Sequence, residues 1–166
     1  MNSLVDQLKT LKLPPGQLVD IVNNNTEYHD NSIFDYLWDQ GLTDVDIYKL
    51  ISKCFFFQSD YVIKKIMNVY FPPSLIVIFI KRTRLGLSKL MLEFLTINKP
   101  SGSDMAYLLY DSPEFLNDDT FALLLASIRT YHEATTIIDN SRNRLTDEQR
   151  VKLLNLALHT ASEHNE

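Results

Sequence analysis

Six consecutive apolar residues, Leu75 to Ile80, run directly into three cations, Lys81, Arg82 and Arg84. An apolar run of this density predicts a buried element, and the cations that follow it must be solvated, paired or bound. Four of the six residues are β-branched, which favours a strand. A lone strand would have nothing to pair with, however, and the neighbouring segments have helical patterns, so we expect residues 75–80 to be helical.

Helical patterns of the same kind recur along the rest of the chain. One buried helix face, with apolar residues at i, i+3, i+4 and i+7, is formed by Ile47, Leu50, Ile51 and Cys54. Near the end of the chain, Thr146 and Gln149 match a capping box at a helix start. The patterns predict an all-α fold of about ten short helices, each of about eight to fifteen residues.

Length and composition indicate one globular domain that spans residues 1–166. The chain has 166 residues, of which 45% are hydrophobic and 22% are charged, as in ordinary globular proteins. It has only four glycines, which disfavours a turn-rich β-sandwich or a glycine-rich nucleotide fold. The single cysteine, Cys54, excludes an intramolecular disulfide and a cysteine-based zinc site.

The expected helix starts are regularly spaced. Apparent helical hairpins begin at Pro14, Thr43, Pro72 and Ser103, which are 29, 29 and 31 residues apart. With such a recurrence over residues 14–130, the chain resembles helical-repeat (α-solenoid) proteins such as the tetratricopeptide, pentatricopeptide and HEAT-type families. That resemblance implies stacked helical hairpins, whereas the side-chain signature of the tetratricopeptide family is absent. After about residue 130 we expect the recurrence to lapse, and an irregular helical bundle is the alternative architecture.

The residues that carry enzyme chemistry show no pattern that predicts a catalytic or metal site. The four glycines are isolated, so no phosphate-binding loop is present. None of the four histidines forms a pair at metal-ligand spacing on a helix, and we expect neither a metal nor a cofactor. His29 lies in a polar loop beside Asp30, with no nucleophile tied to it by spacing. Cys54 lies near the C-terminal end of its expected helix, on an apolar face, where a thiol is a small hydrophobe rather than a nucleophile.

Charge is distributed unevenly along the chain. Residues 61–99 contain seven basic residues and one acidic residue, a net charge of +6, so the rest of the chain has −11 within the total of −5. A basic segment in an acidic protein is a candidate contact surface. It could be a solvated face, a site for an acidic protein or a site for RNA or DNA phosphates. The candidate basic patch consists of Lys64, Lys65, Lys81, Arg82, Arg84 and Lys89.

Aromatic residues supply a second candidate surface. The three residues Phe55 to Phe57 cover nearly the whole circumference of a helix, so they cannot all face one core. At least one of them should lie near the surface, where an aromatic side chain can anchor a partner. The candidate aromatic anchors are Trp38, Phe56, Phe57 and Tyr61.

These observations favour a non-enzymatic protein-interaction or scaffolding module. We expect a helical groove with a basic patch that receives an acidic or amphipathic-helix protein partner. An RNA-binding helical-repeat module that uses the basic segment 61–89 is the alternative. No segment resembles an export signal, and the longest apolar run is too short to span a bilayer, so we expect no membrane insertion and a cytoplasmic or nuclear protein.

Overall fold

The computed structural model describes residues 3–25, 29–110, 112–141 and 144–163, and within these ranges the chain is helical, without a β-strand. Eleven α-helices and two short 3₁₀ turns follow one another: α1 (Leu4–Leu11), α2 (Pro15–Asn24), α3 (Asn31–Asp39), α4 (Asp44–Lys53), η1 (Phe55–Phe57), α5 (Asp60–Ile66), α6 (Pro73–Arg82), α7 (Lys89–Ile97), α8 (Gly102–Leu109), η2 (Pro113–Phe115), α9 (Asp118–Ser127), α10 (Tyr131–Asn140) and α11 (Asp147–Glu163). The all-α class and the approximate helix number predicted from the sequence are confirmed. So is the helical conformation of residues 75–80, which lie within α6.

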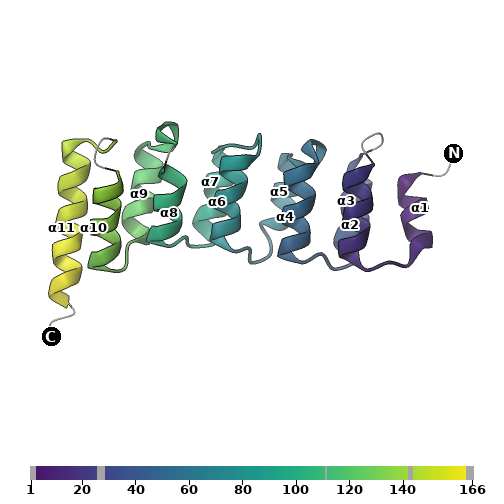
Figure 1. Ribbon diagram of the computed structural model, residues 1–166, viewed down its shortest axis with the longest axis horizontal. Helices are drawn as coiled ribbons and strands as arrows, with labels where there is room; N and C mark the ends of the chain where they lie inside the picture. Colours follow the sequence, from purple (N-terminus) through teal and green to yellow (C-terminus); the bar gives the residue numbers. More distant parts are fainter. Residues whose placement is uncertain (1–2, 26–28, 111, 142–143, 164–166) are drawn as a thin grey trace.

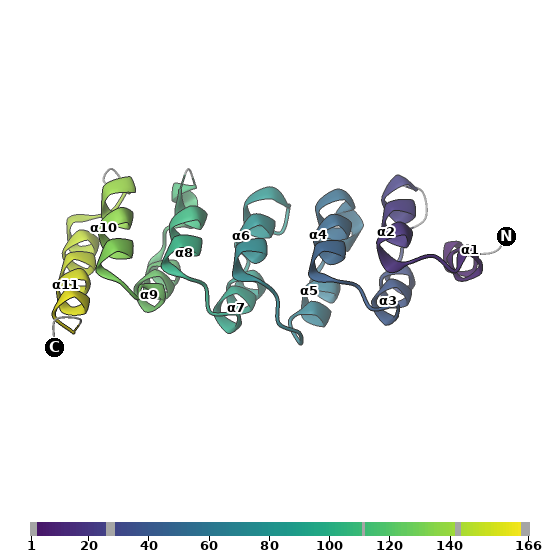
Figure 2. The same ribbon diagram turned by 60° about the horizontal axis from the view of Figure 1, so that its bottom comes forward.

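The helices after α1 form pairs that follow one another along the long axis of the molecule (Figure 1). The first helices of the pairs make one row and the second helices make another, as Figure 2 shows. In the first row α2, α4, α6, α8 and α10 contact one another in turn, and in the second row α3, α5 and α7 do so. In Figure 1 the first helix of each pair ends, and the second begins, at the upper edge of the molecule; these ends, with the described residues between them, are called tips below.

Each helix starts 29 residues after the previous helix of its row. First-row helices start at Pro15, Asp44, Pro73, Gly102 and Tyr131. Second-row helices start at Asn31, Asp60, Lys89, Asp118 and Asp147. The recurrence therefore continues beyond residue 130, where we expected it to lapse, and its spacing is constant where we expected one interval of 31.

The misplaced start is explained by a capping box one step earlier in the chain. The hydroxyl of Ser101, not of Ser103, accepts the backbone N–H of Asp104, at 3.1 Å. The Asp104 carboxylate in turn accepts the Ser101 N–H at 2.9 Å. Thr43 with Asp46 and Thr130 with Glu133 form the same reciprocal box at the starts of α4 and α10. Because each box satisfies two backbone donors at the helix start, these residues fix where α4, α8 and α10 begin.

One apolar core runs through the array. In the middle of the first row, α6 and α8 each have a first-row neighbour on each side as well as a helix of the second row against them. In α6, for example, Ile76, Val77, Phe79 and Ile80 are all buried. The ring of Phe79 stacks on Phe71 and Tyr48, with centroid distances of 5.5 and 5.6 Å, and so joins three successive segments. This explains why α6 has the β-branched, strand-like composition of a segment that is buried nearly all round.

A buried amide joins the third helix pair to the segment that precedes it. Asn98 is 7% exposed and lies at the C-terminal end of α7. Its side-chain oxygen accepts the backbone N–H of Phe71 at 2.8 Å, and its side-chain nitrogen donates to the carbonyl of Phe94 at 2.9 Å. The amide thus satisfies two backbone groups that water cannot reach.

We expect Asn98→Ala to lower the free energy of unfolding by about 2 kcal/mol, because it leaves the buried N–H of Phe71 without a partner and removes one of the two hydrogen bonds to the Phe94 carbonyl. Urea denaturation followed by circular dichroism measures the change. Thr96→Ala is the matched control: its hydroxyl bonds only within the exposed face of α7, so its effect should be a small fraction of that value. Equal effects of the two substitutions would contradict the role assigned to Asn98.

Candidate functional site

A groove lies between α7 and α9 in the second row. It has a volume of about 850 Å³ and is lined by Leu87, Ser88, Lys89, Leu92, Glu93, Thr96, Ile97, Asn117, Asp119, Ala122, Leu123 and Ala126. Small side chains on α9 help to keep it open, because Ala122 and Ala126 are exposed at positions where a longer side chain would fill the space. The position equivalent to Ala122 in α5, two repeats of 29 residues earlier, is Lys64.

The two ends of the groove differ in polarity. Lys89 and Asp119 lie in the first turns of α7 and α9, and Glu93 is one turn further along α7. Ile97, 53% exposed, and Ala126 lie near the other ends of these helices. The groove therefore has charge of both signs at one end and an apolar surface at the other.

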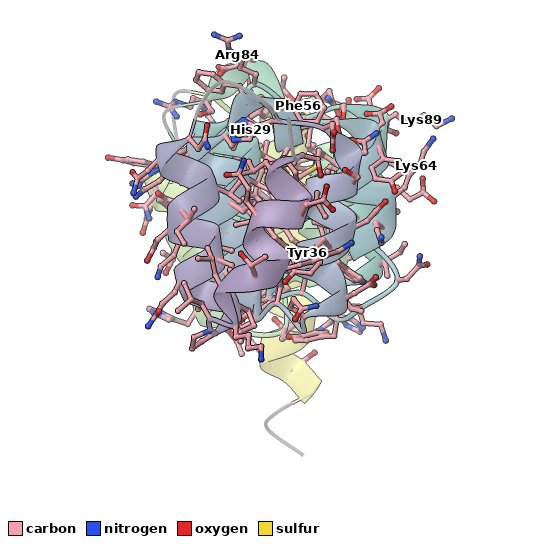
Figure 3. All side chains as sticks on the ribbon, turned by 90° about the vertical axis from the view of Figure 1, so that its right-hand side faces the viewer. His29, Tyr36, Phe56, Lys64, Arg84 and Lys89 are labelled. Carbon is pink, nitrogen blue, oxygen red and sulfur yellow. The ribbon has the colours of Figure 1, made fainter. Side chains whose placement is uncertain are left out.

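The six residues of the candidate basic patch do not gather on one face. Lys64 and Lys89 point to the same side of the molecule, whereas Arg84 projects from the upper edge (Figure 3). Lys64 belongs to α5 and Lys89 to α7, which contact each other in the second row. Arg84 follows the end of α6, at a tip. The structure thus divides the basic segment between the side of the second row and the tips.

Lys65 already has partners within the chain. Its ammonium group forms an ion pair with Asp35 of α3, and the hydroxyl of Tyr61 donates to the same carboxylate at 2.7 Å. The hydrogen bond with Asp35 raises the pKa of Lys65. Burial would raise the pKa of Asp35, but the hydrogen bonds from Lys65 and Tyr61 outweigh burial and lower it. Lys65 and Tyr61 therefore join α3 to α5, and both would have to give up this pairing to bind a partner.

Lys81 is also engaged. Its ammonium group donates to the backbone carbonyls of Tyr107 and Tyr110, at 2.8 and 2.7 Å, and lies 4.4 Å from the ring centroid of Tyr107. It thus binds the C-terminal end of α8, where free carbonyls and the helix dipole favour a cation.

Two exposed arginines and two exposed phenylalanines make up what we call the tip surface: Phe55, Phe56, Arg82 and Arg84. Phe55 is 59% and Phe56 44% exposed. The guanidinium carbon of Arg84 lies 4.2 Å from the centroid of the Phe55 ring. The two phenylalanines and the two arginines are 26 residues or more apart in the chain, so no local sequence pattern predicts that they belong to one surface.

The aromatic candidates separate into exposed and buried residues. The expectation that Phe57 is a surface anchor is wrong: it is 0% exposed and packs against Phe34 and His29, at centroid distances of 6.0 and 5.4 Å. Phe55 takes the exposed position instead. The reason is that η1 is one 3₁₀ turn, whose three side chains point in three different directions, with only Phe57 directed at the core.

Trp38 lies at a second cavity, near the opposite ends of the helices. Half-buried, it packs on Phe34 with a centroid distance of 5.7 Å and lines a cavity of about 340 Å³ with Val69, Tyr70 and Phe71. Tyr70, 76% exposed, is the most exposed large apolar residue in the described part of the chain. Trp38 is therefore accessible from one side only.

Sequence reasoning missed a contact between Cys54 and His29. The sulfur of Cys54 lies 3.1 Å from Nδ1 of His29, whose Nε2 lies 3.0 Å from the carbonyl oxygen of Val22. Because a carbonyl only accepts, Nε2 carries the proton and Nδ1 is free to accept the S–H of Cys54. A pairing of residues 25 positions apart across two tips has no local sequence signal.

This Cys–His pair has the geometry of an activated thiol in an environment that opposes activation. Burial raises the pKa of Cys54, and the backbone N–H groups of Phe56 and Phe57 only partly offset this effect. The residue is 6% exposed, so its sulfur presents little surface to a substrate. Cys54 therefore joins the first two tips as a neutral thiol.

Within the described residues, no group of three or more histidine, cysteine, aspartate or glutamate side chains could hold a metal ion. A search of the same residues finds no helix with the length and apolar character needed to cross a membrane. Comparisons of the chain with protein-family models, with curated proteins and with solved structures find no significant match. The function must therefore be argued from the surfaces themselves.

We expect the stability that the Cys54 thiol contributes to decline in alkaline solution. Since the folded pKa is raised, this contribution is complete below the pKa of the unfolded chain and is lost as the pH rises toward the folded pKa. The difference in free energy of unfolding between the wild type and Cys54→Ala should shrink as the pH rises above the ordinary pKa of a cysteine thiol, about 9. Urea denaturation at a series of pH values measures it, and a difference that grows with pH would contradict the neutral thiol.

Proposed function

We propose that this protein is a non-enzymatic protein-interaction module of the helical-repeat type, and that the groove between α7 and α9 binds an amphipathic helix of a protein partner. The observation that carries the proposal is the groove itself: about 850 Å³ of space along two neighbouring helices, with apolar side chains at its centre and charges at one end.

The spacing of the lining residues supports a helical ligand. On α9, Asp119, Ala122, Leu123 and Ala126 follow the i, i+3, i+4, i+7 pattern of one helix face. The two alanines allow a ligand backbone to approach closely, and Leu92 and Leu123 supply apolar contacts from both walls. Recognition of an amphipathic helix by such a groove uses ligand side chains at the same i, i+3, i+4, i+7 spacing.

The charged end of the groove supports one orientation of the ligand. Lys89 on one wall faces a groove whose other charged residues, Glu93 and Asp119, are acidic. A ligand with an acidic residue near Lys89 and a basic residue near Asp119 would match both charges. Charges at the edge of an interface contribute more to orientation and to the rate of association than to affinity.

The energetic requirement also favours a helix with several apolar anchors. Complete burial of one leucine or isoleucine stabilises a complex by about 1.5–3 kcal/mol. Association costs about 4–15 kcal/mol in lost freedom, so one anchor is not enough. A helix that inserts three apolar side chains between α7 and α9 gains about 4.5–9 kcal/mol, which offsets the lower part of that range, and further contacts add to it.

We expect a library of displayed amphipathic helical peptides, selected on the wild-type protein, to yield ligands with three or more apolar residues on one face. Ala122→Trp should weaken their binding at least about tenfold, because the indole fills the groove. Fluorescence anisotropy with labelled peptides measures the affinity.

Lys64→Trp is the matched control, since it places the same indole at the equivalent position of α5, outside the groove. It should leave the affinity unchanged. Ligands that bind Ala122→Trp as tightly as the wild type would overturn the groove as the binding site.

A further inference from the structure

We propose that the tip surface is a second docking site, separate from the groove, and that it binds an acidic protein segment with an apolar or aromatic side chain beside its carboxylates. The residues that carry the proposal are Phe55, Phe56, Arg82 and Arg84. None of them lines the groove between α7 and α9. The two binding sites can therefore be tested independently of each other.

The two phenylalanines give the site an exposed aromatic face. Phe56 packs edge-on against the buried Phe57, with a centroid distance of 5.5 Å, so it is held in place from below. Phe55, 59% exposed, is covered only in part by Arg84. Phenylalanine and arginine are both enriched at protein interfaces relative to the rest of the protein surface.

Hydrogen bonds hold the two tips together before any partner arrives. The side-chain oxygen of Gln58 accepts the backbone N–H of Arg84 at 2.8 Å, and its side-chain nitrogen donates to the carbonyl of Ile51 at 2.9 Å. Gly86, with φ of +52°, lets the chain turn just after Arg84. Because Arg84 is fixed at its backbone beside Phe55, binding would order less of the chain, and its entropic cost would be lower.

The charge at the tips has no carboxylate partner of its own in the described structure. The ion pairs of the described residues include Lys65, Arg150 and Lys152, but neither Arg82 nor Arg84. Arg82 is the last residue of α6, where the helix dipole favours a cation. Arg84 lies beyond the C-cap residue Thr83, so the dipole does not account for it. Two exposed guanidinium groups without a carboxylate partner, one of them on the exposed ring of Phe55, are complementary to carboxylates that accompany an apolar side chain.

The neighbouring tips favour a short acidic protein segment over a nucleic acid. Exposed acidic residues flank the site on both sides, Asp30 at the preceding tip and Glu114 at the following one. A single strand of RNA follows a continuous basic groove over about 4–16 nucleotides, and these carboxylates would repel its phosphates. A peptide can place its acidic residues at Arg82 and Arg84 and its basic residues beside the carboxylates of the neighbouring tips.

The test is the affinity of a short fluorescein-labelled peptide of alternating glutamates and phenylalanines, measured by anisotropy at physiological salt. A peptide of alternating lysines and phenylalanines is the matched probe, and a labelled oligouridine is the RNA probe. We expect the wild type to bind the glutamate peptide at least about tenfold more tightly than either of the other probes. Similar affinity for both peptides, or tighter binding of oligouridine, would overturn the acidic-segment proposal.

Substitutions locate the site. The double variant Arg82→Glu/Arg84→Glu should weaken binding of the glutamate peptide about tenfold or more, and Phe55→Ala should weaken it without removing charge. The double variant Lys49→Glu/Lys64→Glu makes the same change of net charge at exposed residues outside both proposed sites and should leave the affinity close to that of the wild type. If it weakens binding as much as the tip variant, the attraction is general and the tip surface is not the site.

Ala122→Trp separates the two proposals. It fills the groove without touching the tips, so binding of the glutamate peptide should be unchanged. Loss of that binding in Ala122→Trp would place the acidic segment in the groove and overturn the tip site. All variants change exposed side chains, and circular dichroism with urea denaturation verifies that each is folded.

Discussion

The structure depends on the shortness of its helices. Ten of the eleven described α-helices have seven to ten residues, and α11 has 17. Helices shorter than about 12–15 residues are marginal in water when isolated, so each one needs neighbours to cover its apolar face. The first row meets this need by contact from α2 to α10, with aromatic stacks such as Phe71 on Phe79 between successive pairs. The fold is therefore an array in which each pair depends on the next.

Polar contacts between neighbouring pairs fix how the array is joined. Cys54 contacts His29 of the preceding pair, and Gln58 bonds with the backbone of Arg84 in the next one. Lys81 in turn bonds with the carbonyls at the end of α8, so the first four pairs are connected near their tips. These contacts place Arg84 on Phe55 and create the tip surface. In the second row the equivalent contacts, from Asp35 to Lys65 and Tyr61, join α3 to α5. Between α7 and α9 no such contact is described, and the small side chains of Ala122 and Ala126 leave the space that forms the groove.

Local structure could be predicted from the sequence where all the residues that determine it lie within one helix. The helix start at Thr43, the capping box at Thr146 and the helical conformation of residues 75–80 follow from residues a few positions apart. The start of α8 was misplaced because Ser101 and Ser103 are equally good caps in isolation, and only the reciprocal bond with Asp104 decides between them. Phe57 was misassigned because three adjacent phenylalanines do not show which ring faces the core.

The sequence by itself determined the helical class, the starts of four first-row helices to within two residues and the basic character of residues 61–99, because propensity, capping and charge are local properties. The tertiary structure alone decided which exposed residues meet. It separated Lys64 and Lys89 from Arg84, paired Lys65 with Asp35, joined Cys54 to His29 and opened a groove beside Ala122. Each of these outcomes depends on how successive helix pairs pack, and residues some 26 positions apart carry no local signal of that packing.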